Sequence, residues 1–418
     1  FVLMLIGIPI AYSMGLATLL AFYLSGAWST VNVLTQRMYS GSTSFVLLAI
    51  PFYILTARLM NTSGMTRRIV RFCDLLVGWI PGGLGHVNVV GSMIFAGMSG
   101  SAVADASGLG MVEIEMMTAA GYDKKFSAAV TAASSTIGPI VPPSIPFVIY
   151  GGIAGVSVGR LFLGGVVPGV AMGVGLMIAV YLVAVRRKYP RSATRMSGRE
   201  LAKSVVDAAL ALGCLAIIMG GILFGVFTPT EAAVVACIYA LILGLVIFRD
   251  LKLSDLHGIL WETAKDSVRV LFVVAVATAY AHALTLMHAP EKVFAVFSGL
   301  TSQPVLFLLI INAVLLFLGC FMEGISVMLL VVPILMPVIM RMGIDPVHFG
   351  VMMTLNLMIG LLTPPVGLCL YCVSSVAKLP ISDLVKEVWP YLIALLVVLL
   401  LVAFWPSLTV WLPNLVTI

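Results

Sequence analysis

Two short stretches of the sequence have the residue types to bind a cation inside an apolar environment. They are Gly138–Pro143 (GPIVPP) and Gly360–Pro365 (GLLTPP), and each interrupts a long apolar run. A helix cannot continue through such a stretch, because proline lacks a backbone donor and clashes with the preceding turn. In a membrane, carbonyl groups freed in this way are tolerated only where they face protein or a cavity. Clustered there, they could bind a hard cation such as sodium, as carbonyl-lined ion sites do.

Polar side chains close to the two breaks could complete binding sites. The hydroxyls of Ser99 and Thr363 could join the freed carbonyls as cation ligands. Asp105 and Glu323 are acids within apolar stretches, and a charge is costly to bury in a membrane, so we expect both to face a cavity. The alternative for Asp105, which the sequence leaves open, is that it caps backbone amides near Ser107.

The substrate is expected between the two halves of the chain. Ser134 and Asn356 could contact it, although small polar residues also help membrane helices to pack, and both interpretations stay open. Two further acids, Glu113 and Glu115, are expected to be solvated near the cytoplasmic end of the first polar stretch. The predicted substrate-binding residues are Ser101, Asp105, Ser134, Pro143, Glu323, Asn356 and Pro365.

The two breaks belong to an internal repeat. The segment Gly121–Pro143 is repeated 222 residues later (343 minus 121) as Gly343–Pro365. The same offset pairs Gly97 with Gly319. The ungapped copies are identical at Gly121/Gly343, Asp123/Asp345, Ile137/Ile359, Gly138/Gly360, Pro142/Pro364 and Pro143/Pro365. Paired broken helices in the two halves of an apolar chain indicate the binding site of a secondary transporter.

The composition indicates an all-α polytopic membrane protein. Of 418 residues, 61% are hydrophobic and only 10% are charged, and the mean hydropathy is +1.16, whereas soluble domains carry about 25% charged residues. The net charge of +6 does not indicate nucleic-acid binding, because the basic residues lie in short loops where they set topology. The six cysteines are expected to be buried thiols. No Walker loop, zinc spacing or nucleophile-and-base grouping occurs, which argues against ATP-driven transport and against an enzyme.

The apolar runs predict the elements that position these residues. Two runs with polar middles, Gly82–Ala120 and Pro304–Met340, are expected to be re-entrant hairpins, followed by broken helices over about 123–154 and 347–376. Met65–Ile80 and Glu291–Phe297 are expected to be interfacial helices in contact with lipid. Because about 20 residues span a membrane, simple spans are predicted at Phe1–Leu24, Ser44–Met60, Val158–Val185, Val205–Phe227, Ala232–Phe248, Ser267–Met287 and Val388–Trp411.

The basic loops predict the orientation of the chain. By the positive-inside rule the loops at Arg67–Arg71, Arg186–Arg199, Arg249–Lys252 and Lys378–Lys386 are cytoplasmic. The first hairpin then opens from the cytoplasm and the second from outside, so residues 1–204 and 205–418 form two inverted repeats. This arrangement is common in alternating-access transporters. It also places the C-terminus in the periplasm.

Several motifs resemble the large membrane subunit of tripartite ATP-independent periplasmic (TRAP) transporters. They are GIPIAYSMG (Gly7–Gly15), GMSGSAVADASG (Gly97–Gly108), the stretch Gly121–Gly151, FTPTEAA (Phe227–Ala233), and GCFMEGISVMLLVVPILMPV (Gly319–Val338) with GLLTPPVG (Gly360–Gly367). The resemblance covers essentially the whole chain. It implies a sodium-driven importer of organic acids in a bacterial inner membrane, with an elevator motion of a domain that carries both hairpins. It also implies a small four-helix membrane subunit and a soluble periplasmic binding protein as partners.

The resemblance also implies which residues hold two or more sodium ions. The first site would use Ser99, Gly138, Val141 and Pro142, and the second Gly319, Gly360, Thr363 and Val366. Glu323 departs from the family pattern, where the shorter Asp is expected. The substrate would be a C4-dicarboxylate, sialic acid or a similar carboxylate. Rival hypotheses are a proton-coupled exchanger that uses Asp105 or Glu323 without a binding protein, and a channel lined by the breaks.

Overall fold

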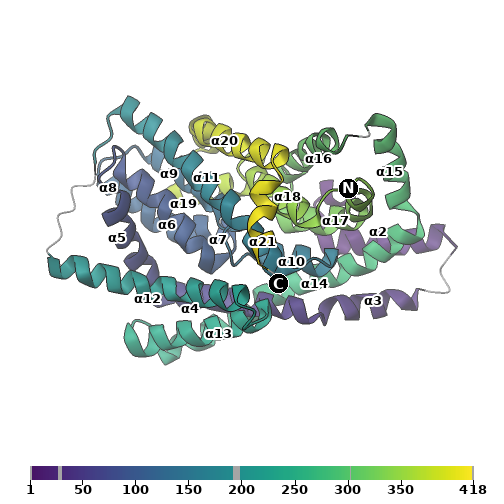
Figure 1. Ribbon diagram of the computed structural model, residues 1–418, viewed down its shortest axis with the longest axis horizontal. Helices are drawn as coiled ribbons and strands as arrows, with labels where there is room; N and C mark the ends of the chain where they lie inside the picture. Colours follow the sequence, from purple (N-terminus) through teal and green to yellow (C-terminus); the bar gives the residue numbers. More distant parts are fainter. Residues whose placement is uncertain (1, 27–30, 192–197, 302, 417–418) are drawn as a thin grey trace.

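The helices of this protein form two packed groups. The computed structural model describes residues 2–26, 31–191, 198–301 and 303–416, and every regular element in these ranges is a helix (Figure 1). Seven of the described helices are long and apolar enough to cross a membrane, or eight if one bent pair is counted as a span. The composition therefore predicted the class correctly: the chain is an all-helical, multi-pass membrane protein.

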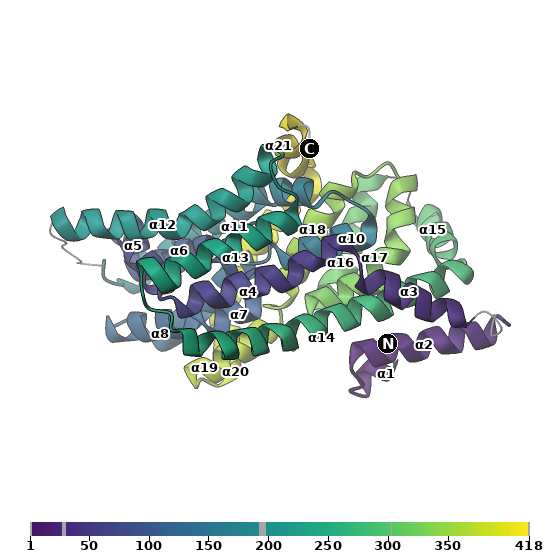
Figure 2. The ribbon, with the colours of Figure 1, turned by 90° about the horizontal axis from the view of Figure 1, so that it is seen from below.

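The first group lies along the lower edge of Figure 1 and faces the viewer in Figure 2. Its members pack around α14, α4 and α13. They are α2 (Ile10–Leu24), α3 (Asn32–Ser42), η2 (Phe45–Leu48), α4 (Ala49–Thr62), α12 (Gly198–Leu223), α13 (Pro229–Ile242), the π-helical η4 (Leu243–Ile247) and α14 (Leu253–Leu286), preceded by α1 (Val2–Leu5).

The second group contains both predicted hairpins and both broken helices. The hairpins are α6 (Gly83–Ser99) with α7 (Ala102–Ser107) and α8 (Leu109–Ala119), and α16 (Pro304–Gly319) with α17 (Gly324–Arg341). The broken helices are α9 (Lys124–Ser134) and η3 (Ser135–Ile137) with α10 (Ile145–Ala154), and α18 (Pro346–Gly360) with α19 (Leu368–Ala377). Around them lie α5 (Met65–Val77), α11 (Val158–Arg187), α15 (Ala289–Leu300), α20 (Ile381–Phe404) and α21 (Ser407–Leu415).

Both breaks occur where the sequence predicts them, and they match in detail. Each contains a cis peptide bond at its Pro-Pro pair, Pro142-Pro143 and Pro364-Pro365. Each broken helix also begins with an aspartate cap: Asp123 accepts a hydrogen bond from the Lys125 amide, and Asp345 from the Val347 amide. Such caps satisfy donors that the first helical turn leaves without partners. The repeat is therefore present in the backbone as well as in the sequence.

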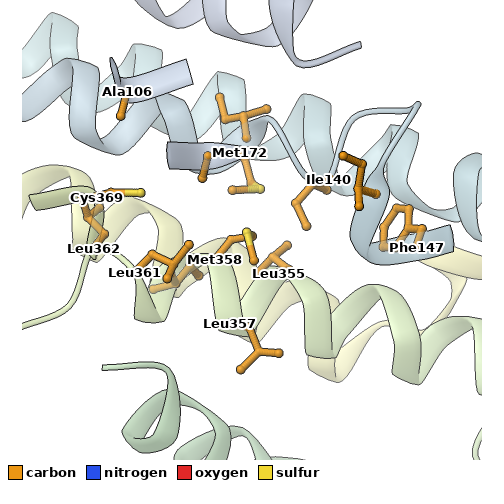
Figure 3. Packing of buried hydrophobic residues seen from close by; sticks show 14 of the residues in the cluster. Ala106, Ile140, Phe147, Met172, Leu355, Leu357, Met358, Leu361, Leu362 and Cys369 are labelled. Carbon is orange, nitrogen blue, oxygen red and sulfur yellow. The ribbon is translucent and has the colours of Figure 1, made fainter. Parts of the chain in front are cut away.

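The two broken helices run antiparallel. Helix α9 packs beside α19, and α10 packs beside α18. The Tyr150 hydroxyl near the end of α10 donates a hydrogen bond to the Pro346 carbonyl at the start of α18, over 2.8 Å. Ile140 and Phe147 lie opposite Leu355 and Met358 in the buried apolar layer between the breaks (Figure 3). This layer holds the two breaks back to back.

Three predicted spans need correction. The run Phe1–Leu24 is not one helix, since Gly7 has φ +92° and α2 begins only after Pro9. The last span ends at Phe404 and a separate α21 follows, because the residue before a proline is disfavoured in the helical region, here Trp405 before Pro406.

The third correction concerns the span predicted at Ser267–Met287, which starts too late. Helix α14 begins at Leu253, since three of its charged residues are paired rather than breaking the helix: Lys265 with Glu262, and Asp266 with Arg58 of α4. Helix α3, which packs on α14, was not predicted at all.

The basic loops gather at one end of the described structure. The Tyr122 hydroxyl, just before α9, donates to the Pro190 carbonyl just after α11, over 2.6 Å. Arg187 pairs with Glu387 over 2.6 Å, and Arg68 pairs with Asp250 over 2.7 Å. These contacts join the segments that the positive-inside rule assigns to the cytoplasm.

Candidate binding site at the hairpin tips

A cavity of about 560 Å³ lies between the hairpin tips and helices α4 and α14. Ser101 and Glu323 line it from the two tips, and Pro139 and Leu361 line it from the two breaks. The two repeats therefore converge on one space, as the paired breaks predict. On the opposite wall are charged residues that the sequence analysis did not single out: Arg58, Asp266 and Arg269.

The tip of the first hairpin packs on the first break. Gly100 has φ +58°, and a Cβ atom there would lie 3.2 Å from the Ile145 nitrogen and 3.3 Å from the Pro143 carbonyl oxygen. The next residue, Ser101, caps α7 by accepting a hydrogen bond from the Ala104 amide. Only glycine has both the conformational freedom and the small size for this turn.

Asp105 faces the first break and is absent from the cavity lining. Its side chain is buried, with 2% exposed. A Cβ atom added to Gly138 would lie 2.5 Å from Asp105 Oδ2. The N-cap of α7 is Ser101, and Asp105 lies against the backbone of the first break.

The tip of the second hairpin meets the second break backbone to backbone. A Cβ atom on Gly360 would lie 2.8 Å from both the Cα and the carbonyl carbon of Gly319. The Gly367 amide also donates to the Cys320 carbonyl, over 3.2 Å. Glu323 caps α17, accepting from the Ser326 amide and hydroxyl over 3.1 and 3.2 Å, and it lines the cavity.

The first break offers oxygen atoms suited to a hard cation. In the part of the chain that the structure describes, the carbonyls of Gly138, Val141 and Pro142 accept no hydrogen bond. Backbone oxygens without partners are rare inside proteins. The side chain of Ser99, predicted as a fourth ligand, lies outside the described residues.

The second break brings its predicted residues together differently. Gly319 and Gly360 are in contact, and the Gly360 carbonyl accepts from the Thr363 amide over 3.0 Å. The Thr363 hydroxyl donates to the Ile359 carbonyl over 2.8 Å. A hydroxyl that donates in this way keeps its lone pairs for another partner. Val366 is half-buried and Pro365 is exposed, whereas Pro143, its counterpart in the first break, is buried.

Ser134 and Asn356 lie away from the cavity, and both are fully buried. The Ser134 hydroxyl donates to Asn88 Oδ1 over 2.6 Å, and Asn356 Nδ2 donates to the carbonyl and Oδ1 of Asn312 over 2.8 and 2.7 Å. These bonds tie each broken helix to the first arm of its own hairpin. These contacts are of the kind by which small polar residues help membrane helices to pack, and the contact of either residue with substrate stays a prediction.

One expectation about the acids is wrong. Glu115 is exposed as expected, but Glu113 is fully buried. It lies on the face of α8 that packs on α6, where a Cβ atom on Gly91 would be 3.0 Å from Glu113 Oε1. The cysteine expectation holds among the described residues: all six are free thiols, five of them buried.

The missed cavity residues carry a signal that could have found them. Arg58 lies within the predicted span Ser44–Met60, and a charge inside a membrane span usually faces a partner or a cavity. It forms an ion pair with Asp266, which also contacts Arg269 over 3.4 Å. The charge of Arg58 is a weak signal in the sequence, because Arg58 lies only two residues before Met60, where the predicted span ends.

With this geometry in hand, comparison with known proteins identifies the family. A family model described as "Tripartite ATP-independent periplasmic transporter, DctM component" matches residues 1–408. The chain belongs to this family. It is 45% identical over 413 residues to the sialic acid TRAP transporter large permease protein SiaM of Vibrio cholerae, with 99% of this chain and 96% of SiaM aligned.

Two further relatives support this TRAP family assignment. The C4-dicarboxylate TRAP transporter large permease protein DctM of Pseudomonas aeruginosa is 40% identical, over 96% of this chain and 94% of that protein. The sialic acid TRAP transporter permease protein SiaT of Haemophilus influenzae is 42% identical, over 99% of this chain and 67% of SiaT. These relatives are transporter permeases, not enzymes.

Solved structures of other transporters share the fold. The YdaH transporter of Alcanivorax borkumensis, whose crystal structure is described as having an unusual topology, superposes with a TM-score of 0.69. Its sequence is 14% identical, and the match covers 91% of this chain and 89% of YdaH. The similarity at this level of identity concerns the fold alone.

Proposed function

We propose that this TRAP large subunit is the transport component of a sodium-coupled, binding-protein-dependent importer of organic acids. Sialic acid and C4-dicarboxylates are the leading substrates, because they appear in the names of relatives at 45% and 40% identity. The observation that carries the proposal is the cavity between the two hairpin tips, which combines Ser101, Glu323, Arg58 and Arg269.

The charged wall of the cavity suits a carboxylate substrate. Arginine presents planar, paired donors that match a carboxylate. Asp266 pairs with Arg58, so substrate binding would exchange one anionic partner for another. The apolar lining from Ile54, Val270 and Met358 would contact the carbon skeleton. In this proposal Asp105 would influence cation binding at the first break, and Glu323 would contact the substrate.

Two sodium ions fit the residues of the breaks. The first would be held by the carbonyls of Gly138, Val141 and Pro142 with Ser99. The second would be held by the Thr363 hydroxyl and the backbone of Gly319, Gly360 and Val366. The available donors are oxygen atoms, which hard cations prefer. Sodium supplies positive charge at the hairpin tips, so that binding of an anion next to them becomes dependent on the sodium gradient.

The proposed motion is an elevator. The group with both hairpins, which contains the cavity's tip residues, would move against α4, α12, α13 and α14. Residues 1–204 and 205–418 would be inverted repeats, an arrangement supported by the antiparallel packing of α9 with α19 and α10 with α18. The chain would lie in the bacterial inner membrane with its C-terminus in the periplasm.

The proposed partners are a small four-helix membrane subunit and a periplasmic substrate-binding protein. The SiaT permease of Haemophilus influenzae extends well beyond the aligned part, which is 67% of its length. The extra length leaves room in that protein for a fused membrane subunit. The exposed apolar side chains of α12, which include Leu201, Val205 and Val206, are available for such a subunit or for lipid.

The deciding experiment is uptake into proteoliposomes that hold this chain with its small subunit. Labelled sialic acid and succinate are each offered with the matching binding protein, first under an inward sodium gradient and then under a proton gradient alone. Uptake that requires both sodium and the binding protein supports the proposal. Uptake on protons without a binding protein would replace it with the exchanger that uses Asp105 or Glu323 as a proton carrier.

The second sodium site has its own test. Replacing Thr363 with alanine removes the side-chain oxygen, and we expect the sodium concentration for half-maximal uptake to rise about tenfold, as for loss of roughly 1.4 kcal/mol of binding. Thr354→Ala is the control, because this buried hydroxyl donates only within α18, to Gly350, over 2.7 Å. An equal sodium dependence in Thr363→Ala and the wild type would remove Thr363 from the site.

A further inference from the structure

A second and larger cavity adjoins the one at the hairpin tips. It measures about 870 Å³ and lies between α5, α12 and the start of α8. Asn61 and Gly108 line both cavities. The two spaces are therefore neighbours along one route, which leads from the hairpin tips towards the basic end of the molecule.

The two cavities differ in charge. The lining of the cavity at the hairpin tips contains two basic residues, Arg58 and Arg269, and two acidic ones, Asp266 and Glu323. The lining of the larger cavity is unbalanced, with four basic residues against Asp207 and Asp250. The four are Arg67, Arg68, Arg71 and Lys203.

One of these basic residues, Arg68, is held in ion pairs with acidic neighbours. Arg68 pairs with Asp250 over 2.7 Å and with Asp207 over 3.7 Å, and its guanidinium lies 4.1 Å from the centre of the Phe248 ring. Both acids of the lining are thus paired with Arg68. The three other basic residues are exposed.

Two of those side chains, Arg67 and Lys203, are available to a mobile anion. The third, Arg71, pairs with Glu200 over 3.7 Å, and Glu200 is not part of the lining. In the described part of the chain, no ion pair involves Arg67 or Lys203. Solvated basic side chains at such a mouth attract anions over roughly 10 Å at moderate salt.

We propose that the larger cavity is a release vestibule in which Arg67 and Lys203, with Arg71 beside them, form a second, weak binding site for the organic anion. The inference rests on the proposed function and deepens it. An anion that leaves on the cytoplasmic side moves against the negative-inside membrane potential and towards an anionic lipid surface. The positive lining lowers the electrostatic cost of that step, and solvent exposure keeps binding weak enough for release.

Two other roles for the same residues give different predictions. If the basic residues only set topology, any equally cytoplasmic basic residue is equivalent to them. If they bind a phospholipid headgroup instead, occupation of the vestibule depends on anionic lipid and not on a soluble carboxylate. A matched pair of double variants separates these roles: Arg67→Gln with Lys203→Gln in the vestibule, and Arg186→Gln with Lys386→Gln outside it.

The local potential is measured first, without any transport. Val112, which lines the vestibule and is 37% exposed, is changed to cysteine in a Cys372→Ser background, since the five other cysteines are buried. Membrane-impermeant methanethiosulfonates with a negative or a positive group are added from the cytoplasmic side. We expect the negative reagent to be favoured, and the vestibule double variant to reduce that preference about threefold or more.

The outcomes decide between the three roles. The proposal predicts that 20 mM succinate slows labelling in vesicles of phosphatidylcholine alone, and that 0.5 M salt abolishes the effect, as roughly expected for screened charges. An equal loss of preference in the control double variant would leave only the topological role. Protection by phosphatidylglycerol and not by succinate would establish a lipid site instead.

Transport gives the second measurement. Exchange of internal labelled succinate for external succinate in proteoliposomes should slow several-fold in the vestibule double variant and stay unchanged in the control. Failure of the proposed function shows separately, as a loss of sodium or binding-protein dependence in the wild type. If the labelling preference is absent in the wild type, the vestibule proposal is overturned whatever the coupling ion.

Discussion

The two hairpin tips meet their breaks by different contacts, although the breaks themselves match in sequence and backbone. In the first repeat, Gly100 turns over Pro143 and the Asp105 carboxylate faces Gly138. In the second, Gly319 and Gly360 touch directly, and the acid Glu323 lines the cavity instead. One acid thus lies against a break and the other lines the cavity. The comparison shows that equivalent backbones can carry side chains with separate tasks.

The glycine contact of the second repeat should be the most sensitive point. Gly360→Ala would place a Cβ atom 2.8 Å from the Gly319 backbone, which cannot move away as a side chain can. We expect nearly complete loss of transport and a stability loss of about 1–3 kcal/mol from overpacking. Thermal unfolding in detergent and uptake in proteoliposomes measure the two effects.

The first repeat supplies a sharper form of this test. Gly138→Ala would clash mainly with the Asp105 carboxylate, at 2.5 Å, since the nearest backbone atom, the Ser135 carbonyl oxygen, is 3.2 Å away, and a side chain can rotate. Its effect should therefore be smaller than that of Gly360→Ala. Gly220→Ala in α12 is the control, because nothing lies within 4 Å of its added Cβ atom. If both breaks respond equally, the contrast drawn between the tips is wrong.

The two acids should separate function from stability. Glu323→Gln keeps the shape and the cap of α17 but replaces a carboxylate in the cavity lining with an amide, a weaker hydrogen-bond acceptor for donor groups of the substrate, so we expect uptake to fall at least about tenfold with little change in unfolding temperature. Asp105→Asn alters a buried group against the break, so both uptake and sodium dependence should fall. Uptake is measured as a function of sodium concentration for both variants. If the two variants show the same sodium dependence, the distinction between the roles of Asp105 and Glu323 is wrong.

The buried amide contacts should affect stability more than substrate binding. Ser134→Ala leaves Asn88 Oδ1 without its 2.6 Å donor, and Asn356→Ala leaves Asn312 Oδ1 without its 2.7 Å donor. Each unsatisfied buried group costs about 1–3 kcal/mol. We expect lower unfolding temperatures with an unchanged KM for substrate. A raised KM at normal stability would show instead that Ser134 and Asn356 contact the substrate.

The caps of the broken helices should give the smallest difference. Asp345 accepts from two amides, Val347 and His348, whereas Asp123 accepts from the Lys125 amide alone. Loss of a cap costs about 0.5–2 kcal/mol, so Asp345→Ala should destabilise more than Asp123→Ala. Unfolding temperatures of the pair, with the conservative Asp→Asn variants as controls, rank the two caps.

Local chemistry determined the breaks and the membrane class, which the sequence analysis predicts correctly, and also several helix caps, which it does not name. The breaks follow from proline, which removes a donor wherever it stands, and the caps at Asp123 and Asp345 follow from aspartate beside free amides. The cap at Thr228 has the same origin, and there Glu231 completes a capping box. The membrane class follows from composition. None of these depends on what packs against the segment.

Tertiary structure alone decided which side chains meet. The sequence does not show which neighbours Ser134 and Asn356 have, and only the tertiary structure places them against Asn88 and Asn312. Glu113 resembles Glu115 in sequence, yet the face of α8 that packs on α6 buries one and leaves the other exposed. Arg58 lines the cavity because α4 packs against α14. There it contacts Asp266, which is 208 residues away in the sequence. Such long-range pairings depend on how whole helices pack, which local residue patterns do not specify.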